Sequence, residues 1–218
     1  MRKRTLLSSA PAFTIKTRSI KKATATAISI INRPDHNFIK KSRKHPVHML
    51  PARDTISADS LPFAAGLPPA RGKFTDVVIL GSFPGRQSLL HHEYYGNPQN
   101  HFWKIIEALF QIDHHLPYKV RISRLTSQRI ALWDVVSACC RQGSADAGIH
   151  SPVFNNLQSF VGSCPSLRLI ALNGTSAGRY FRLMKIPVPC IVLPSTSPAN
   201  TRYSLNEKIE RWKIICSV

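Results

Sequence analysis

The segment YYGNPQNHFW, residues 94 to 103, combines aromatic rings with amide side chains. Aromatic faces can stack on a planar heterocycle, and amide groups can hydrogen-bond to its edge. Phe102 and Trp103 have a simpler interpretation, because they begin an amphipathic pattern that would pack on a sheet. We therefore predict core positions for Phe102 and Trp103, and places in a pocket for Tyr95 and Asn100.

Two other loops consist of small, rigid and polar residues. In GSFPGRQS, residues 81 to 88, two glycines permit a tight turn and close approach of a ligand. This loop lacks the GxGxxG pattern and no GK[ST] sequence follows, so it does not predict a phosphate cradle. In LPSTSPANTRY, residues 193 to 203, hydroxyl groups on a stiff loop are placed to donate hydrogen bonds to a phosphodiester backbone. Taken singly, each loop is better explained as a plain turn or connector.

The same loops contain no obvious acid, base or nucleophile, and no lysine. The five cysteines, at positions 139, 140, 164, 190 and 216, form no CxxC pair and no zinc or iron–sulfur signature. Their odd number argues against a full set of disulfides and favours a reducing compartment. We expect no metal and no cofactor.

The elements that must position these loops alternate along the chain from residue 76. Four short apolar runs predict strands buried on both faces of a parallel sheet, at residues 76–82, 130–136, 167–173 and 188–194. Helical patterns stand between and after them, at residues 99–110, 118–128, 153–163, 175–184 and 204–215, the last with a capping box at Ser204 and Glu207. The prediction is a three-layer α/β/α sandwich around a short, mainly parallel four-stranded sheet. Ligands in such folds bind beyond the carboxyl ends of the strands, at the loops after residues 81, 135, 173 and 193.

The N-terminal part is different in composition. Residues 1–70 are rich in Lys, Arg, Ser, Thr, Ala and Pro without a sustained period, so we expect a disordered extension before a folded domain at residues 71–218. Residues 1–48 carry +11 of the formal charge of +19. Three interpretations of this segment stay open: a DNA-binding arm, an organellar targeting peptide, or an extension upstream of a true start at Met49. The remaining +8 favours a polyanionic partner, nucleic acid before membrane, against the alternative that charge serves solubility alone.

Four motifs in order, ILGSFPG, YYGNPQNHFW, ALWDV and LPSTSPA, resemble the uracil-DNA glycosylase superfamily and, within it, the hypoxanthine (deoxyinosine) DNA glycosylase family. The resemblance covers roughly residues 76–215. Related families hold the attacking water with an Asp or Asn at the position of Phe83, which cannot do so. The resemblance implies that Asn100 is the catalytic residue instead, and that Tyr95 stacks on the flipped base. It also places Asn97 where relatives commonly have His.

The resemblance further implies two groups of binding residues. The pocket for the base would be formed by Gly81, Ser82, Phe83, Pro84, Tyr95, Asn97, Asp134, Val135 and Ser137. By the resemblance DNA would be contacted by Ser195, Thr196, Ser197 and Pro198, and the polar loop that contains them adds Asn200 and Arg202.

The expected function is that of a monofunctional DNA glycosylase that excises deaminated bases, hypoxanthine with uracil or xanthine as further candidates, and so initiates base excision repair. The expected partner is double-stranded DNA, with single strands left open, and the expected state is a monomer. No apolar run is long enough to cross a bilayer, and we expect a cytoplasmic, nucleoid-associated protein. The alternatives are a mismatch-type uracil-DNA glycosylase, a catalytically weakened DNA-binding homologue, and an unrelated doubly wound nucleotide-binding protein.

Overall fold

The computed structural model describes residues 63–143 and 146–218, and its centre is a four-stranded parallel sheet. The strands are β2 (Val77–Gly81), β3 (Ile130–Asp134), β6 (Leu169–Asn173) and β7 (Cys190–Leu193), in the order β3-β2-β6-β7. Each corresponds to one of the four apolar runs, so the predicted sheet is confirmed. β2 is buried at all five positions, as expected for a central strand covered on both faces.

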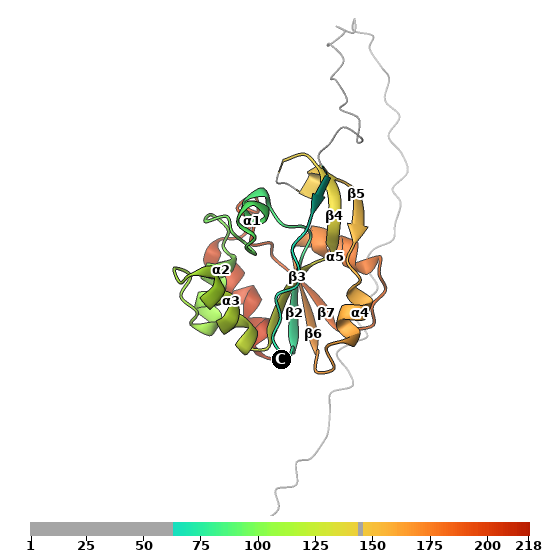
Figure 1. Ribbon diagram of the computed structural model, residues 1–218. Helices are drawn as coiled ribbons and strands as arrows, with labels where there is room; N and C mark the ends of the chain where they lie inside the picture. The colour runs from blue at the N-terminus through green and yellow to red at the C-terminus, as the bar shows by residue number, and fades with distance from the viewer. Residues whose placement is uncertain (1–62, 144–145) are drawn as a thin grey trace, which may run out of the picture. The chain divides into compact units, whose positions relative to one another are not determined.

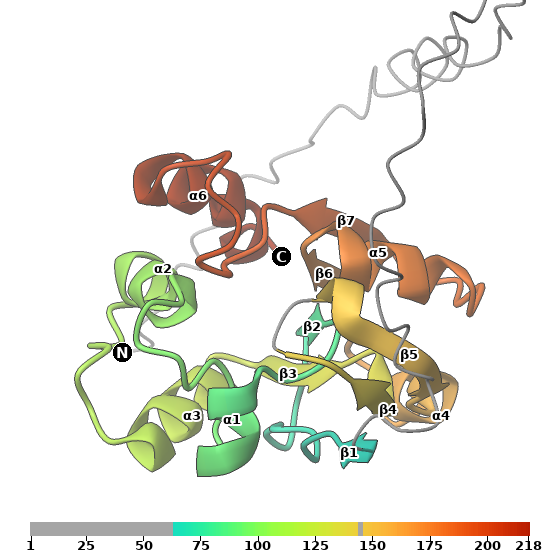
Figure 2. The same cartoon turned by 90° about the horizontal axis from the view of Figure 1, so that it is seen from above.

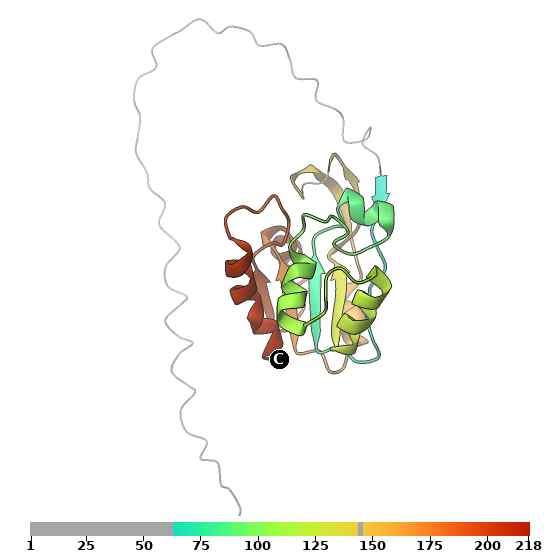
Figure 3. The same ribbon diagram turned by 90° about the vertical axis from the view of Figure 1, so that its left-hand side faces the viewer.

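Two layers of helices enclose this sheet (Figures 1, 2 and 3). α2 (Phe102–Phe110), α3 (Tyr118–Ser127) and α6 (Leu205–Trp212) cover one face, where Ile105, Leu125 and Trp212 join one core cluster. α4 (Leu157–Gly162) and α5 (Thr175–Arg182) cover the other face, where Phe160 and Phe181 join a second cluster. The predicted three-layer α/β/α sandwich is therefore confirmed.

The helix boundaries follow local chemistry. α6 begins with the predicted capping box, because the Ser204 side chain accepts a hydrogen bond from Glu207 N while the Glu207 carboxylate accepts one from Ser204 N. It is followed by a 3₁₀ turn, η3 (Lys213–Cys216). The short helix α1 (Arg86–His91) was not predicted, since its sequence follows directly from the Gly and Pro turn.

A second, antiparallel sheet was also missed. It contains β1 (Phe63–Ala65), β4 (Val136–Arg141) and β5 (Ile149–Phe154), in the order β1-β4-β5, with the 3₁₀ turn η2 (Asp146–Gly148) before β5. The prediction of a helix from residue 153 was wrong at its start, because residues 153 and 154 belong to β5 and α4 begins at Leu157. In Figure 1 this sheet lies above β3, at the end where the chain leaves that strand.

The folded part begins before the predicted boundary at residue 71. Residues 63–65 form β1, which pairs with β4, and Ala70 forms a bridge with Leu132. The Tyr94 hydroxyl shares its one proton between the carbonyl oxygens of Leu67 and Pro68, so residues 63–70 are part of the domain and not of the extension. The predictions for residues 1–62 lie outside the described residues. Within the described ranges no helix is long and apolar enough to cross a membrane.

Candidate active site

A cavity of about 840 Å³ lies at the carboxyl ends of the parallel strands, lined by the loops that follow β2, β3, β6 and β7. Its volume falls in the usual range of ligand pockets, about 300–1,000 Å³. The structure brings most of the predicted site residues to this cavity: Gly81, Ser82, Phe83, Pro84, Tyr95, Asn97, Asn100, Asp134, Ser195, Thr196, Ser197, Pro198, Asn200 and Arg202.

Val135 and Ser137 were also predicted here, but they do not line the cavity. Val135 is fully buried in the core, and its backbone N donates to the carbonyl oxygen of Gly81 at 2.9 Å. Ser137 lies in β4, where its hydroxyl donates to the carbonyl oxygen of Val153 at 3.0 Å. The reason is that the chain continues after Asp134 into β4, so only Asp134 remains at the strand end.

Asn100 is held at the start of α2. Its backbone N donates to the carbonyl oxygen of Asn97 at 2.8 Å, and its Oδ1 accepts from Phe102 N at 3.0 Å. Because a backbone N–H can only donate, the second contact fixes which end of the amide is the oxygen. The amide is therefore oriented before any ligand arrives, and Oδ1 retains a second lone pair for a water molecule.

Asn97 shapes the same turn. Its side-chain Oδ1 accepts from Gln99 N at 2.9 Å, which is an Asx turn. Its backbone carbonyl oxygen accepts from the backbone N of Asn100. The turn explains why α2 begins at Phe102, three residues later than predicted. Asn97 thus serves to position Asn100 as well as lining the cavity.

The side chain of Tyr95 is held by contacts to one face of its ring and to its hydroxyl. Its backbone has a positive φ of 57°, its ring stacks on Phe102 with 3.8 Å between the centroids and 16° between the planes, and its hydroxyl accepts from Asn173 Nδ2 at 3.1 Å. Burial above all, and then the nearby Asp134 carboxyl, raise the pKa of the phenol, so it remains protonated at physiological pH. Only the face of the ring that does not contact Phe102 is left for a base.

Asn173, which the sequence argument did not select, connects the two sides of the site. Its Nδ2 also donates to Thr196 Oγ1 at 2.9 Å, while its Oδ1 accepts from Thr196 N at 2.9 Å. Thr196 is fully buried, so within the predicted DNA-binding motif it secures the loop. The signal for Asn173 was available, because a polar residue ends the apolar run of β6 just before Gly174, whose φ is 98°.

The loop at residues 193–203 is held by hydrogen bonds from the start of α2 and from α6. His101 N donates to the carbonyl oxygen of Thr196 at 3.0 Å, and Trp212 Nε1 donates to that of Pro194 at 3.0 Å. Lys208, which is fully buried, donates to the carbonyl oxygen of Asn200 at 2.9 Å and contacts His101 Nδ1 at 3.3 Å. The loop is therefore fixed in place before it meets a ligand.

Asp134 is the buried acid of the site. It is 5 % exposed, and its pKa is raised to about 8, chiefly by burial and also by the neighbouring Asp146 carboxylate, while Arg141 acts in the opposite direction. Asp146 lines the cavity as well and accepts a hydrogen bond from Ser82 Oγ at 2.6 Å. The cavity therefore contains two carboxyl groups, of which Asp134 was predicted from the sequence and Asp146 was not.

Comparison with known proteins assigns the fold and the site to a family. The model of the uracil DNA glycosylase superfamily matches residues 69–216, which is more than half of the chain. The chain belongs to the uracil DNA glycosylase superfamily. Members of this superfamily are hydrolytic DNA N-glycosylases, so the expected enzyme class and DNA as its substrate are confirmed.

Individual superfamily members agree with this assignment. A hypoxanthine DNA glycosylase of Methanosarcina acetivorans is 37% identical over 152 residues, covering 69% of this chain and 96% of its own. A hypoxanthine DNA glycosylase of Methanosarcina barkeri is 34% identical over 149 residues, covering 67% of this chain and 94% of its own. A solution NMR structure of a Methanosarcina acetivorans protein with a suggested uracil DNA glycosylase assignment superposes with a TM-score of 0.64 and 35% identity, covering 71% of this chain and 96% of that one.

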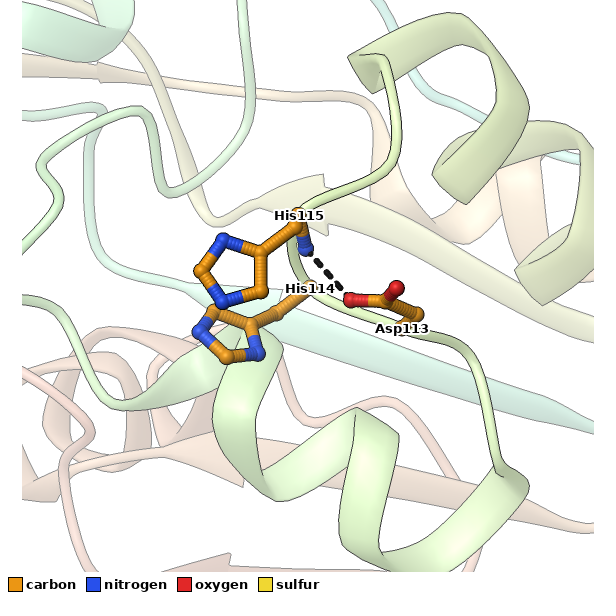
Figure 4. A group of neighbouring side chains, drawn as sticks. All are labelled: Asp113, His114 and His115. Atoms are coloured by element: carbon orange, nitrogen blue, oxygen red, sulfur yellow. Dashed lines mark hydrogen bonds between the residues drawn. The ribbon is translucent and has the colours of Figure 1, made fainter.

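One further group of polar side chains lies outside this superfamily site. Asp113, His114 and His115 adjoin one another in the turn between α2 and α3 (Figure 4). Asp113 Oδ1 accepts from His115 N at 2.8 Å, which is an Asx turn, and His114 Nδ1 pairs with the Glu107 carboxylate. These contacts account for the arrangement by local structure, and none of the three residues lines the cavity.

Proposed function

We propose that the protein removes hypoxanthine from DNA by hydrolysis of the N-glycosidic bond, with uracil and xanthine as further substrates, and thereby starts base excision repair. Two relatives that align over nearly their whole length are hypoxanthine DNA glycosylases. The cavity size and the aromatic and amide lining suit a planar base turned out of the duplex.

The observation that carries the proposal is the fixed amide of Asn100. With Oδ1 anchored by Phe102 N, the side chain can hold a water molecule in a constant direction without rearranging. Phe83 is 6 % exposed and belongs to the core, so the position used for this purpose in related families has no such group here. An amide is a weak base at neutral pH, so its role is to orient the water and not to take its proton.

The reaction begins with rotation of the nucleotide out of the stack, which is least costly for a mispaired or damaged base. As the glycosidic bond lengthens, the sugar gains oxocarbenium character and the base gains negative charge. The DNA phosphates stabilise the sugar cation, while the base lies against the open face of Tyr95.

The cavity mouth offers cations for the flanking phosphates. Arg202 and Arg211 are exposed, and their guanidinium carbons lie 5.4 Å and 4.7 Å from the ring centroid of Tyr203. Ser195 and Ser197 stand on the adjacent loop, which is secured by Asn200 Nδ2 donating to the carbonyl oxygen of Ser195 at 2.9 Å. Such contacts fix the register of the duplex without reading its sequence.

The enzyme is proposed to be monofunctional and to leave an abasic site. Among the described residues that line the cavity there is no lysine, and Lys208 beneath it is engaged by Asn200 and His101. Schiff-base chemistry needs a lysine amine within reach of the sugar. Borohydride treatment during turnover is expected to trap no covalent protein–DNA adduct.

The deciding experiment is a single-turnover glycosylase assay on duplexes with inosine, uracil, xanthine or no lesion. We expect base release from the inosine duplex and a loss of at least a hundredfold in the rate constant for Asn100→Ala. Asn97→Ala is the neighbouring comparison and is expected to lose less, since Asn97 lines the cavity but acts on the water through the turn that positions Asn100. Undiminished cleavage by Asn100→Ala would refute its assigned role.

The main alternative is a DNA-binding homologue with weakened catalysis, which Phe83 and Asn97 would favour because both differ from related families. It predicts tight binding to an abasic-site duplex without release of any of the three bases. A mismatch-type uracil-DNA glycosylase would instead release uracil opposite G faster than hypoxanthine.

A further inference from the structure

The carboxyl group of Asp134 has an unmet requirement for a hydrogen-bond partner. It ends β3, lines the cavity and is 5 % exposed. Its backbone carbonyl accepts from Asn155 Nδ2 at 2.8 Å, but within residues 63–143 and 146–218 its side-chain Oδ2 is buried without a partner. Buried polar atoms in native proteins are almost always paired, and a charged oxygen without a partner is costly, so this unpaired oxygen favours the neutral form of a carboxyl that lines the cavity.

The position of the carboxyl is enforced by Gly81. The two residues are paired in register at the ends of β2 and β3, and a Cβ atom on residue 81 would collide with Asp134 Oδ1. Any other residue at position 81 would displace the acid. The absence of a side chain at Gly81 therefore leaves the space that the Asp134 carboxyl occupies.

The charged and titratable groups around Asp134 favour its protonated form. Asp146 from η2 adds negative charge, and Arg141 from β4 partly offsets it, while burial dominates and raises the pKa of Asp134 to about 8. Tyr94 and Tyr95, from the loop before α2, have raised pKa values of their own and remain neutral phenols. At neutral pH the carboxyl is therefore a hydrogen-bond donor.

We propose that Asp134 donates its carboxyl proton to the base as it leaves. The inference rests on the glycosylase function proposed above. The bond between C1′ and the base breaks with both electrons remaining on the base, and the carboxyl proton moves to a ring nitrogen or carbonyl oxygen of that base. The water held by Asn100 adds to C1′, loses one proton to solvent and keeps the other in the new hydroxyl group. The Asp134 carboxylate regains a proton from solvent after the products leave.

This role divides the reaction between two residues and accounts for the choice of base. Deamination replaces an amino group, which donates, with a carbonyl oxygen, which accepts. A protonated carboxyl can donate to that carbonyl oxygen before the bond breaks, and an ionised carboxylate would repel it. Asn100 then orients the water, and Asp134 protonates the leaving base.

The test is the pH profile of single-turnover release from an inosine duplex between pH 6 and 10. We expect the wild-type rate constant to fall about tenfold per pH unit above pH 8, as the carboxyl ionises. Asp134→Asn should be about 10²- to 10⁴-fold slower at pH 7 and should lack this limb. Asp146→Asn should keep the limb but move it to lower pH, because it removes a negative charge beside Asp134. Asp113 does not line the cavity, so Asp113→Asn is the matched control and should have the wild-type profile.

A second arm separates proton donation from mere hydrogen bonding. Uracil and 5-fluorouracil differ in how much the leaving base needs a proton, since fluorine stabilises the departing anion. The loss caused by Asp134→Asn should be clearly smaller for 5-fluorouracil, while binding to a duplex with an uncleavable 2′-fluoro nucleotide stays within about threefold of wild type.

The outcomes separate this proposal from the function on which it rests. Failure of wild type to release any base would refute both. Normal release with the same alkaline limb in wild type, Asp134→Asn and Asp146→Asn would refute proton donation alone, since the base's own titration would then explain the limb. Equal losses for uracil and 5-fluorouracil would also overturn it.

Discussion

The ring of Tyr95 lies parallel to that of Phe102 at 3.8 Å, and its hydroxyl is held by Asn173, so both the plane and the edge of the tyrosine are fixed. Tyr95→Ala should weaken binding to an uncleavable inosine duplex by about 1–3 kcal/mol, the usual contribution of stacking one base on an aromatic ring. Tyr95→Phe keeps the ring and loses one hydrogen bond, so it should cost about 1 kcal/mol in stability and little in affinity. Fluorescence anisotropy and thermal unfolding measure the two effects. Equal affinity losses for both variants would contradict the stacking role.

Lys208 beneath the site is expected to matter for rate more than for stability. Burial lowers its pKa, and burial together with Lys208 and Lys104 lowers that of His101, so neutral His101 accepts through Nδ1. Lys208→Met removes a buried charge but leaves two acceptors unpaired, opposing effects of similar size. We expect the excision rate constant to fall about tenfold, because the start of α2 at His101 and the 193–203 loop at Asn200 both lose an anchor.

The control for Lys208 is Lys213→Met. Lys213 is exposed and pairs with Glu210 at 2.7 Å, and an exposed ion pair of this kind contributes little to stability. Its excision rate and thermal midpoint should match the wild type. A Lys208→Met protein with the full excision rate would show that the start of α2 and the 193–203 loop keep their positions without the ammonium group.

Much of this arrangement was predictable because β2, β3, β6 and β7 are apolar on both faces and their ends must meet at one edge. Asn100 and Tyr95 followed from motifs in that edge. β4 was not predictable, because Val135 joins it directly to β3 without a turn residue, and for the same reason Val135 and Ser137 were misplaced. The raised pKa of Asp134 could not be predicted either, since it depends on burial and then on the Asp146 carboxylate, which only the fold brings beside it.

Arg202 is expected to contact one DNA phosphate. Arg202→Gln should reduce the slope of log affinity against log salt by about 1 and weaken binding similarly on all sequences. Arg124→Gln is the control, because α3 leads into the amino end of β3, at the opposite edge of the sheet from the cavity. The measurement is a series of anisotropy titrations at about 50 to 200 mM salt, where the affinity for DNA depends strongly on the salt concentration. An unchanged slope for Arg202→Gln would place the duplex elsewhere.

The last prediction concerns stability as a function of pH. The pKa of Asp134 is about 8 in the folded protein against an ordinary value of 3.8, so between these pH values the folded state binds a proton that the unfolded state releases. The stabilisation from this group is complete below about pH 4 and is lost as the pH rises toward 8. The free energy of unfolding of wild type, relative to Asp134→Asn, should therefore fall with a slope of up to ~1.4 kcal/mol per pH unit across this window. Urea unfolding of both proteins at several pH values measures the difference. A constant difference would mean that Asp134 is already ionised in the folded protein, and would remove the proton that the proposed chemistry needs.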